Sequence, residues 1–239
     1  GVRLSITALP AWLNHRELPL LLREVDEAVL QVHAVMDPRR GLFDAAQAGR
    51  WVARWAELCP VPFRVALPAY GSRVSWDERG RVSSIESEEA RYGRDAESEE
   101  LFAAPREVAR LLAELRVRPP VGFAGVVWFR LPVAGDRRAW SLGSWLAVLR
   151  GGDLFTRVSA RVTGAGDVTL ANEGAVDAEQ PPLLRVAGRC GSGEGVGAYE
   201  WRGDGFARAR RRWLRAGERQ VIGWVRCEEG TSVQVLEAE

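Results

Sequence analysis

The chain has 239 residues, of which 46% are hydrophobic and 27% charged, and its 33 basic and 32 acidic side chains leave a net charge of +1. These values are ordinary for a globular protein. They exclude a disordered chain, a fibrous repeat and a dedicated polyanion-binding domain with a large positive excess. All 33 of these basic side chains are arginine, so chemistry that requires lysine, such as a Schiff base or a P-loop, is excluded as well.

The N-terminal residues already have the composition of a strand, without the basic region and apolar core of a signal peptide. We therefore expect upstream sequence in the natural protein, where a targeting signal would lie. The most apolar stretch, residues 18–35, is interrupted by four charged side chains and is not predicted to cross a membrane.

The first half of the chain alternates apolar runs with amphipathic runs. The apolar runs predict strands at residues 4–9, 28–35, 63–69 and 125–131. The amphipathic runs predict helices at residues 16–25, 44–58, 105–115 and 139–149. The second of these helices is well marked, because Asp44 is a good N-cap and Ala48, Val52 and Trp55 fall on one face. This alternation favours parallel βαβ units in which helices cover a sheet.

Alternate residues within the predicted strands differ in character. One set is apolar, as Leu30, Val65 and Val127 illustrate, whereas the other set contains small and polar residues toward the strand ends. In an α/β barrel the apolar set packs under the helices, and the other set lines the interior and forms a site at the C-terminal strand ends. The alternative, an open doubly wound sheet, usually has two apolar faces. We therefore predict an α/β fold with the C-terminal half of a TIM-like barrel over residues 1–152, the upstream half being absent from this chain.

Two further regions have their own patterns. Residues 72–104 are predicted to be an insertion, with a hairpin at 73–76 and 81–85 followed by an acidic loop at 86–100. Residues 153–239 contain short alternating runs separated by glycine-rich turns, which predict a small all-β sandwich domain. The chain is thus predicted to hold two domains, divided near residue 152.

Several side chains are candidates for a ligand-binding site at the strand ends. They are Gln31, His33, Tyr70, Trp128 and Arg130. The imidazole of His33 can donate, accept or transfer a proton near neutral pH. In this interpretation the ring of Tyr70 lines the pocket and its hydroxyl bonds a ligand. Trp128 offers a flat face to sugar C–H surfaces, and Arg130 offers paired donors to a carboxylate or phosphate. The structural alternatives are a histidine fixed by core hydrogen bonds, a tyrosine closing the barrel end, a tryptophan plug and an arginine paired with an acid.

The sequence does not indicate a reaction. Glycoside hydrolysis needs two carboxyl groups flanking the scissile bond, and none of the predicted strands ends in an inward-facing aspartate or glutamate. We recognise no nucleophile elbow, no metal-ligand spacing and no cofactor motif, so we predict no metal and no cofactor. The arginine run at 208–215 is interpreted as the solvated face of a strand, so no nucleic-acid partner is predicted.

The three cysteines lack zinc-ligand or redox spacing. Cys59 ends a predicted helix and is interpreted as a buried thiol. Cys190 and Cys227 lie in the same C-terminal region, where a disulfide and two free thiols both remain open.

A combination of segments resembles a known family. The segments are 4–13, 25–29, Gln31-Val32-His33, 41–44, 63–72 and 125–132, with 170–174 continuing the likeness. Together they resemble the bacterial family catalogued as domain of unknown function 3142. The resemblance implies a glycoside-hydrolase-like barrel of unestablished activity, an exported or cell-envelope location, and acids in an upstream strand.

Two functions follow as hypotheses. In the first, the strand-end site binds or cleaves a bacterial saccharide, and the acids of such a hydrolase lie upstream of residue 1. In the second, the chain is a non-catalytic glycan- or protein-binding module of the cell envelope. Acidic residues at upstream strand ends would distinguish the two.

Overall fold

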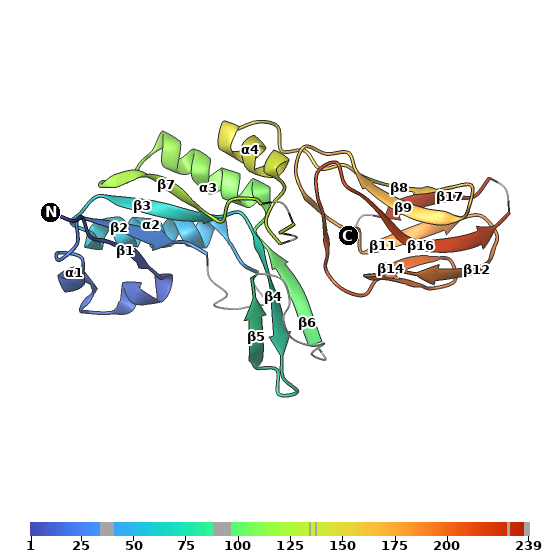
Figure 1. The fold of residues 1–239 in the computed structure, drawn as a ribbon, viewed down its shortest axis with the longest axis horizontal. Coiled ribbons are helices and arrows are strands. Elements are labelled where there is room, and N and C mark those ends of the chain that lie inside the picture. Colours follow the sequence, from blue (N-terminus) through green and yellow to red (C-terminus); the bar gives the residue numbers. More distant parts are fainter. Residues whose placement is uncertain (34–40, 88–96, 134, 137, 229, 237–239) are drawn as a thin grey trace.

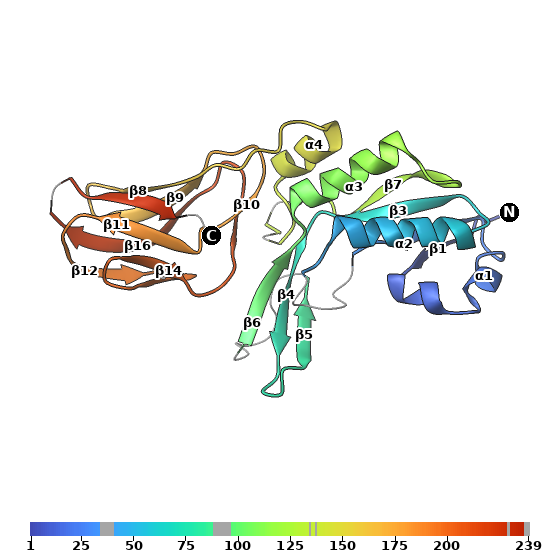
Figure 2. The ribbon, with the colours of Figure 1, turned by 180° about the vertical axis from the view of Figure 1, so that it is seen from behind.

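The computed structural model describes residues 1–33, 41–87, 97–133, 135–136, 138–228 and 230–236. Its N-terminal part contains a sheet of four parallel strands in the order β1-β2-β3-β7. These strands are β1 (Ser5–Ala8), β2 (Glu27–Gln31), β3 (Phe63–Pro68) and β7 (Phe123–Phe129). The helical elements are η1 (Pro10–Asn14), α1 (Leu18–Leu21), α2 (Ala45–Leu58), α3 (Pro105–Val117) and α4 (Leu142–Arg150). Figure 2 shows α2 and α3 lying across one face of this sheet.

The helices form where the sequence supplies both a cap and an apolar face. The side chain of Asp44 accepts a hydrogen bond from the backbone N–H of Gln47 and so caps α2. Ala48, Val52 and Trp55 of this helix are buried against the sheet. Helix α3 begins with Pro105 in its first turn and buries its own apolar face in the same core. This packing confirms the amphipathic pattern of residues 44–58 and 105–115.

A second sheet leaves the C-terminal end of β3. It is antiparallel, in the order β5-β4-β6, and consists of β4 (Gly71–Trp76), β5 (Val82–Glu86) and β6 (Glu97–Phe102). Strands β4 and β5 pair where the sequence predicts a hairpin. Strand β6 lies partly in the segment expected to be an acidic loop, and it pairs with β4 along its whole length. Figure 1 shows this sheet projecting away from the parallel one.

The C-terminal part is all β. Its strands are β8 (Val158–Val162), β9 (Asp167–Asn172), β10 (Ala178–Glu179), β11 (Leu183–Ala187), β12 (Cys190–Gly195), β13 (Tyr199–Trp201), β14 (Gly205–Arg208), β15 (Trp213–Leu214), β16 (Arg219–Cys227) and β17 (Ser232–Leu236). They form sheets β12-β16-β9-β8 and β13-β14-β11-β17, with β10 and β15 as a separate pair. Leu170 and Ile222 from the first sheet and Leu184 and Phe206 from the second share one core. The two sheets therefore resemble a β-sandwich.

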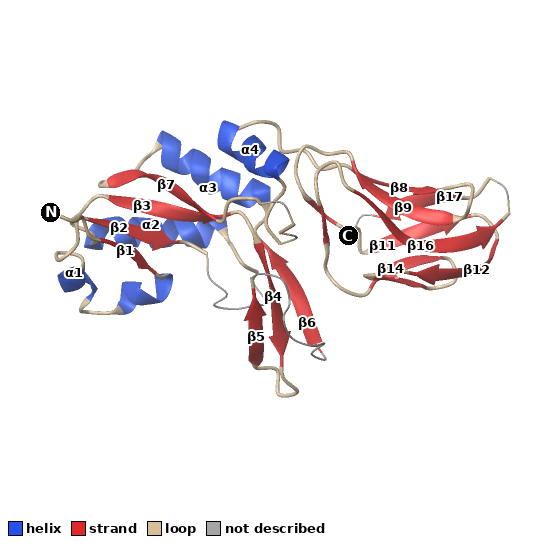
Figure 3. Cartoon of the chain, viewed as in Figure 1, coloured by secondary structure: helices blue, strands red, loops and turns tan. Residues whose placement is uncertain are grey.

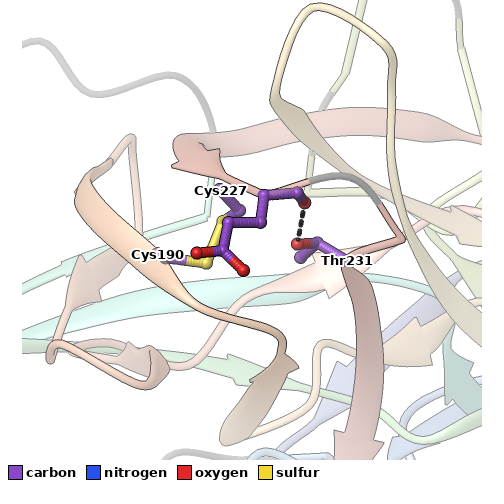
Figure 4. Close-up of a disulfide and its surroundings, with 4 residues drawn as sticks. Cys190, Cys227 and Thr231 are labelled. Carbon is purple, nitrogen blue, oxygen red and sulfur yellow. Dashed lines mark hydrogen bonds between the residues drawn. A yellow bond between two sulfur atoms is a disulfide. The ribbon is translucent and has the colours of Figure 1, made fainter.

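A disulfide joins Cys190 at the start of β12 to Cys227 at the end of β16 (Figure 4). Of the two possibilities that the sequence left open, the structure therefore has the bridge. Cys59 is a buried free thiol, as predicted. Among the described residues, no helix combines the length and the apolar character needed to cross a membrane.

The prediction of half a TIM-like barrel is wrong. The described residues contain four α-helices, while their strands lie in five separate sheets, mostly antiparallel, which is closer to a mostly-β fold. Figure 3 shows that all the helices lie in the N-terminal part. Repeated strand–helix alternation predicts parallel neighbours and covering helices, but it carries no information about whether a sheet closes. The parallel strands form a sheet of four, and antiparallel pairing dominates the rest of the chain.

Candidate functional site

The C-terminal ends of β2, β3 and β7 lie at one edge of the parallel sheet, because neighbouring parallel strands point the same way. His33 follows β2, Tyr70 follows β3 and Phe129 ends β7. Strand β4 begins at the same edge, directly after Tyr70 (Figure 1). This edge therefore gathers side chains from segments far apart in the sequence.

His33, Tyr70 and Phe129 form one cluster. The Nδ1 of His33 lies 3.1 Å from the hydroxyl oxygen of Tyr70. The ring of Phe129 stacks on the imidazole with centroids 5.4 Å apart and meets the Tyr70 ring edge-on at 5.2 Å. His33 is 1% exposed and Tyr70 6%, whereas Phe129 is 45% exposed. The cluster thus presents one aromatic ring to solvent above a buried polar pair.

Burial keeps this polar pair uncharged. Desolvation lowers the pKa of His33 from 6.5 to about 4, so its imidazole is neutral at pH 7. Desolvation likewise raises the pKa of the Tyr70 phenol, against the smaller opposing effects of Ser72 and Arg130. Within the described residues, the buried Nε2 of His33 makes no hydrogen bond. Both groups are therefore neutral hydrogen-bonding groups at physiological pH.

Arg130 lies beside the cluster but already has a partner. Its guanidinium carbon is 5.7 Å from the centroid of the Tyr70 ring. Its Nε and Nη2 are each 2.5 Å from one carboxylate oxygen of Asp136, and the two side chains are only 20% and 14% exposed. Partial burial would raise the pKa of Asp136, but the backbone N–H groups of Ala139 and Arg138 and the guanidinium outweigh it and lower that pKa. The pair is ionised and contributes no net charge to the site.

Gln31 has a supporting place. Its side-chain amide donates to the backbone carbonyl of His33 at 3.0 Å, directly after the end of β2. The residue is half-buried. Gln31, His33, Tyr70 and Arg130 therefore lie close together, and their role in ligand binding stays a prediction.

Trp128 lies on the other face of the sheet, which corrects its sequence assignment. Phe63 pairs with Phe123 but Arg64 pairs with Gly125, so β7 carries one extra residue at this point. Gly125 has a φ of +135°, a conformation that glycine adopts readily and that fits such a bulge. The bulge reverses the facing of all later residues of β7. Trp128 pairs with Leu67, whose side chain is in the helix-covered core, and its ring packs near Trp140 and Trp145 at 6.2 and 5.9 Å.

The same reversal brings Phe129 into the cluster, which the sequence reasoning missed. A glycine inside a strand pattern is the signal that could have revealed the bulge. Asp136 was missed too, although its position six residues after Arg130 in a proline- and glycine-containing stretch is compatible with a return turn.

A second cluster of charges lies near the same edge. The Arg138 guanidinium is 3.3 Å from Glu100 and 3.7 Å from Glu86, and all three side chains are less than a fifth exposed. The carboxylates of β5 and β6 are therefore drawn to an arginine that precedes α4. No group of three or more histidine, cysteine, aspartate or glutamate side chains suited to a metal ion occurs in the part of the chain that is described.

The sequence predicts that the arginine run at 208–215 is the solvated face of a strand, but two of these arginines are engaged in contacts within the protein. Arg208 is only 9% exposed and pairs with Glu179 at 2.6 Å. Arg215 donates to the backbone carbonyls of Asp136 and Ala139. The run does not form one continuous strand, because β14 ends at Arg208, and Arg212 and Arg215 contact residues of the N-terminal part.

Comparisons with known proteins give families without an assigned function. A model for "Domain of unknown function (DUF3142)" matches residues 1–134, and one for "Domain of unknown function (DUF8456)" matches residues 155–228. No curated protein matches. The solved structure of chitinase ChiA74 from Bacillus thuringiensis is similar to 90% of this chain with 12% identity and a TM-score of 0.37, and this chain covers 46% of the chitinase.

Proposed function

The chain belongs to the DUF3142 family, whose model covers more than half of it, and from the cluster at its strand ends we propose that it binds an uncharged saccharide there. The observation that carries the proposal is the neutral His33–Tyr70 pair beneath the exposed ring of Phe129.

Such a site matches the surface of a sugar. A pyranose presents an apolar C–H face and a rim of hydroxyls, which an aromatic ring and neutral donors and acceptors complement. Phe129 supplies the exposed ring, and the buried His33–Tyr70 pair beneath it is neutral and adds no charge to that surface. Arg130 is the cation beside the cluster among the residues that the structure describes, and Asp136 neutralises it, which favours an uncharged ligand over an anionic one.

The charges at this edge favour binding over hydrolysis. A glycosidase needs one carboxyl group that stays protonated near neutral pH, usually by burial away from cations. The pKa of Asp136 is instead lowered by its backbone donors and Arg130. Glu86 and Glu100 both lie against Arg138. The carboxylates described here are thus placed to organise the site, and the proposal is a non-catalytic glycan-binding module.

The disulfide is compatible with a location outside the cytoplasm, where such bonds form and persist. A cell-envelope or exported glycan-binding protein is the corresponding proposal for its setting.

Affinity electrophoresis against uncharged polysaccharides (glucan, mannan, xylan, chitin oligomers) and anionic ones (alginate, polygalacturonate) tests the proposal. We expect retardation by at least one uncharged polysaccharide. Phe129→Ala should weaken that binding about tenfold, because a lost aromatic contact costs on the order of 1.4 kcal/mol.

Phe155→Ala is the matched control, because Phe155 is 43% exposed in the segment after α4 and is not part of the cluster. Binding of anionic polysaccharides alone, or equal loss in both variants, would contradict the proposal. If the wild-type chain released reducing sugar and His33→Gln did not, the proposal of a non-catalytic binding module would be rejected in favour of a hydrolase.

A further inference from the structure

One short segment of the C-terminal part, residues 212–216, contacts strand β6 and the stretch between β7 and α4, which both lie beside the candidate site. Trp213 stacks on Phe102 of β6 with ring centroids 4.2 Å apart. Arg212 lies 3.8 Å from Glu100 of the same strand. Arg215 reaches the stretch between β7 and α4. The segment therefore contacts the projecting sheet and the segment that carries Asp136.

The Arg215 contact is specific in its atoms. Its Nη2 donates to the backbone carbonyl oxygens of Asp136 and Ala139, the second at 3.2 Å. The carboxylate of Asp136 accepts from the backbone N–H groups of Arg138 and Ala139, each at 3.0 Å. Arg215 thus binds the same short stretch whose internal hydrogen bonds orient the Asp136 carboxylate toward Arg130.

This stretch is also bonded to the strand end that carries Tyr70. The N–H of Gly71 donates to the carbonyl of Arg138 at 2.7 Å, and the N–H of Trp140 donates to the carbonyl of Ala69 at 2.9 Å. Tyr70 and Ala139 form a β-bridge between these two bonds. A displacement of Ala139 would therefore displace Tyr70.

A second anchor lies beside the first. The carboxylate of Asp177, which is 1% exposed, accepts from the N–H of Ser141 at 2.8 Å and from the N–H of Ala216 at 2.9 Å. It joins the start of α4 to the 212–216 segment directly. The stretch that orients Asp136 is therefore held from the C-terminal part at Arg215 and at Asp177.

We propose that Arg215 is a positioning residue of the saccharide site: it holds the backbone carbonyls of Asp136 and Ala139 so that the Arg130–Asp136 pair lies against Tyr70. The proposal rests on the proposed function for its ligand, but its geometry is independent of that ligand. It makes the C-terminal sheets part of the site, although they contribute no side chain to the cluster.

Histidine NMR provides a readout that needs no ligand. The chain has only two histidines, His15 and His33, so the imidazole signals are simple to assign. We expect Arg215→Ala to shift the His33 signals and to leave those of His15 in place. Arg215→Lys, which keeps a cationic donor, should restore the His33 signals partly. Arg202→Ala is the matched control, because Arg202 is 64% exposed and pairs locally with Glu200.

The second readout is affinity for the uncharged polysaccharide that retards the wild-type chain most. Arg215→Ala should weaken binding by roughly 2- to 150-fold, the fold-change that corresponds to the range of coupling between residues of one network. In the Arg130→Ala background it should add less than about twofold, because Arg215 acts through that pair.

Unchanged His33 signals in a folded Arg215→Ala variant would overturn the inference. It would also be overturned if the loss of affinity in the Arg130→Ala, Arg215→Ala double variant equalled the product of the two single losses. If no polysaccharide binds the wild-type chain but the His33 signals shift, the proposed function fails and the positioning role stands. Should Arg215→Ala fail to fold, Arg215→Gln carries the same NMR test.

Discussion

Burial of His33 should make this chain less stable in acid. Its pKa is lowered from 6.5 to about 4 by burial, so the unfolded chain binds a proton over a pH range in which the folded chain does not. Stability is then complete above the unfolded pKa and falls as the pH drops from 6.5 toward 4. Below the folded pKa both states carry the proton and this loss levels off.

The size of the loss follows from the two pKa values. Each pH unit between them removes about 1.4 kcal/mol from the free energy of unfolding. Between pH 7 and pH 4.5, linkage therefore gives a loss of about 2.5 kcal/mol from His33 alone. His33 is 1% exposed, so solvent screening reduces this value little.

Urea unfolding of wild type and His33→Gln at both pH values isolates the effect. Carboxylates such as Asp136 add their own acid dependence, but they do so in both proteins and cancel in the difference. His15→Gln is the control and should keep the full wild-type loss. This role of His33 would be refuted if the loss of unfolding free energy between the two pH values differed by less than about 0.5 kcal/mol between wild type and His33→Gln. An NMR titration of His33 with a midpoint above 6 would refute it as well.

Two further outcomes are expected. Changing Cys190 and Cys227 to serine should lower the free energy of unfolding by about 2–4 kcal/mol, since the bond closes a chain separation of 37 residues, and reductant should have no such effect on the double variant. Trp128→Ala should lower the free energy of unfolding in urea by about 3 kcal/mol, because its ring packs near Trp140 and Trp145, and should leave polysaccharide affinity unchanged. Weakened binding by the folded variant would contradict the assignment of Trp128 to the face opposite the cluster.

Local signals in the sequence predict local structure well in this chain. The cap at Asp44 and the spacing of Ala48, Val52 and Trp55 are sufficient to locate α2. Strand β6 is different, because its glutamates favour a solvated loop and only pairing with β4 makes it a strand. The prediction that the sheet closes into a barrel is wrong, since the alternation of residues along one strand does not show how many strands the sheet contains.

The candidate site divides in the same way. Alternation along β2 and β3 correctly places His33 and Tyr70 on one face, because neither strand is interrupted. The same rule fails in β7, where the bulge at Gly125 exchanges Trp128 for Phe129. The partners of Arg130 and Arg215 come from turns and from a distant part of the chain, which periodicity does not address. The division into domains at residues 1–152 and 153–239 stays a prediction.

The use of arginine alone has a structural consequence at the few positions where the guanidinium is buried. Arg130 donates from Nε to Asp136 while its Nη2 lies against the same carboxylate oxygen, and Arg208 uses Nη1 for the carbonyl of Gln180 and Nη2 for Glu179. These contacts need a planar group with several donors, which lysine does not have. Arg16, by contrast, is 92% exposed in its pair with Glu17, and such pairs contribute little. Replacing arginine by lysine should therefore be tolerated at Arg16, whereas at Arg208 it should lower the free energy of unfolding by weakening the contacts with Gln180 and Glu179.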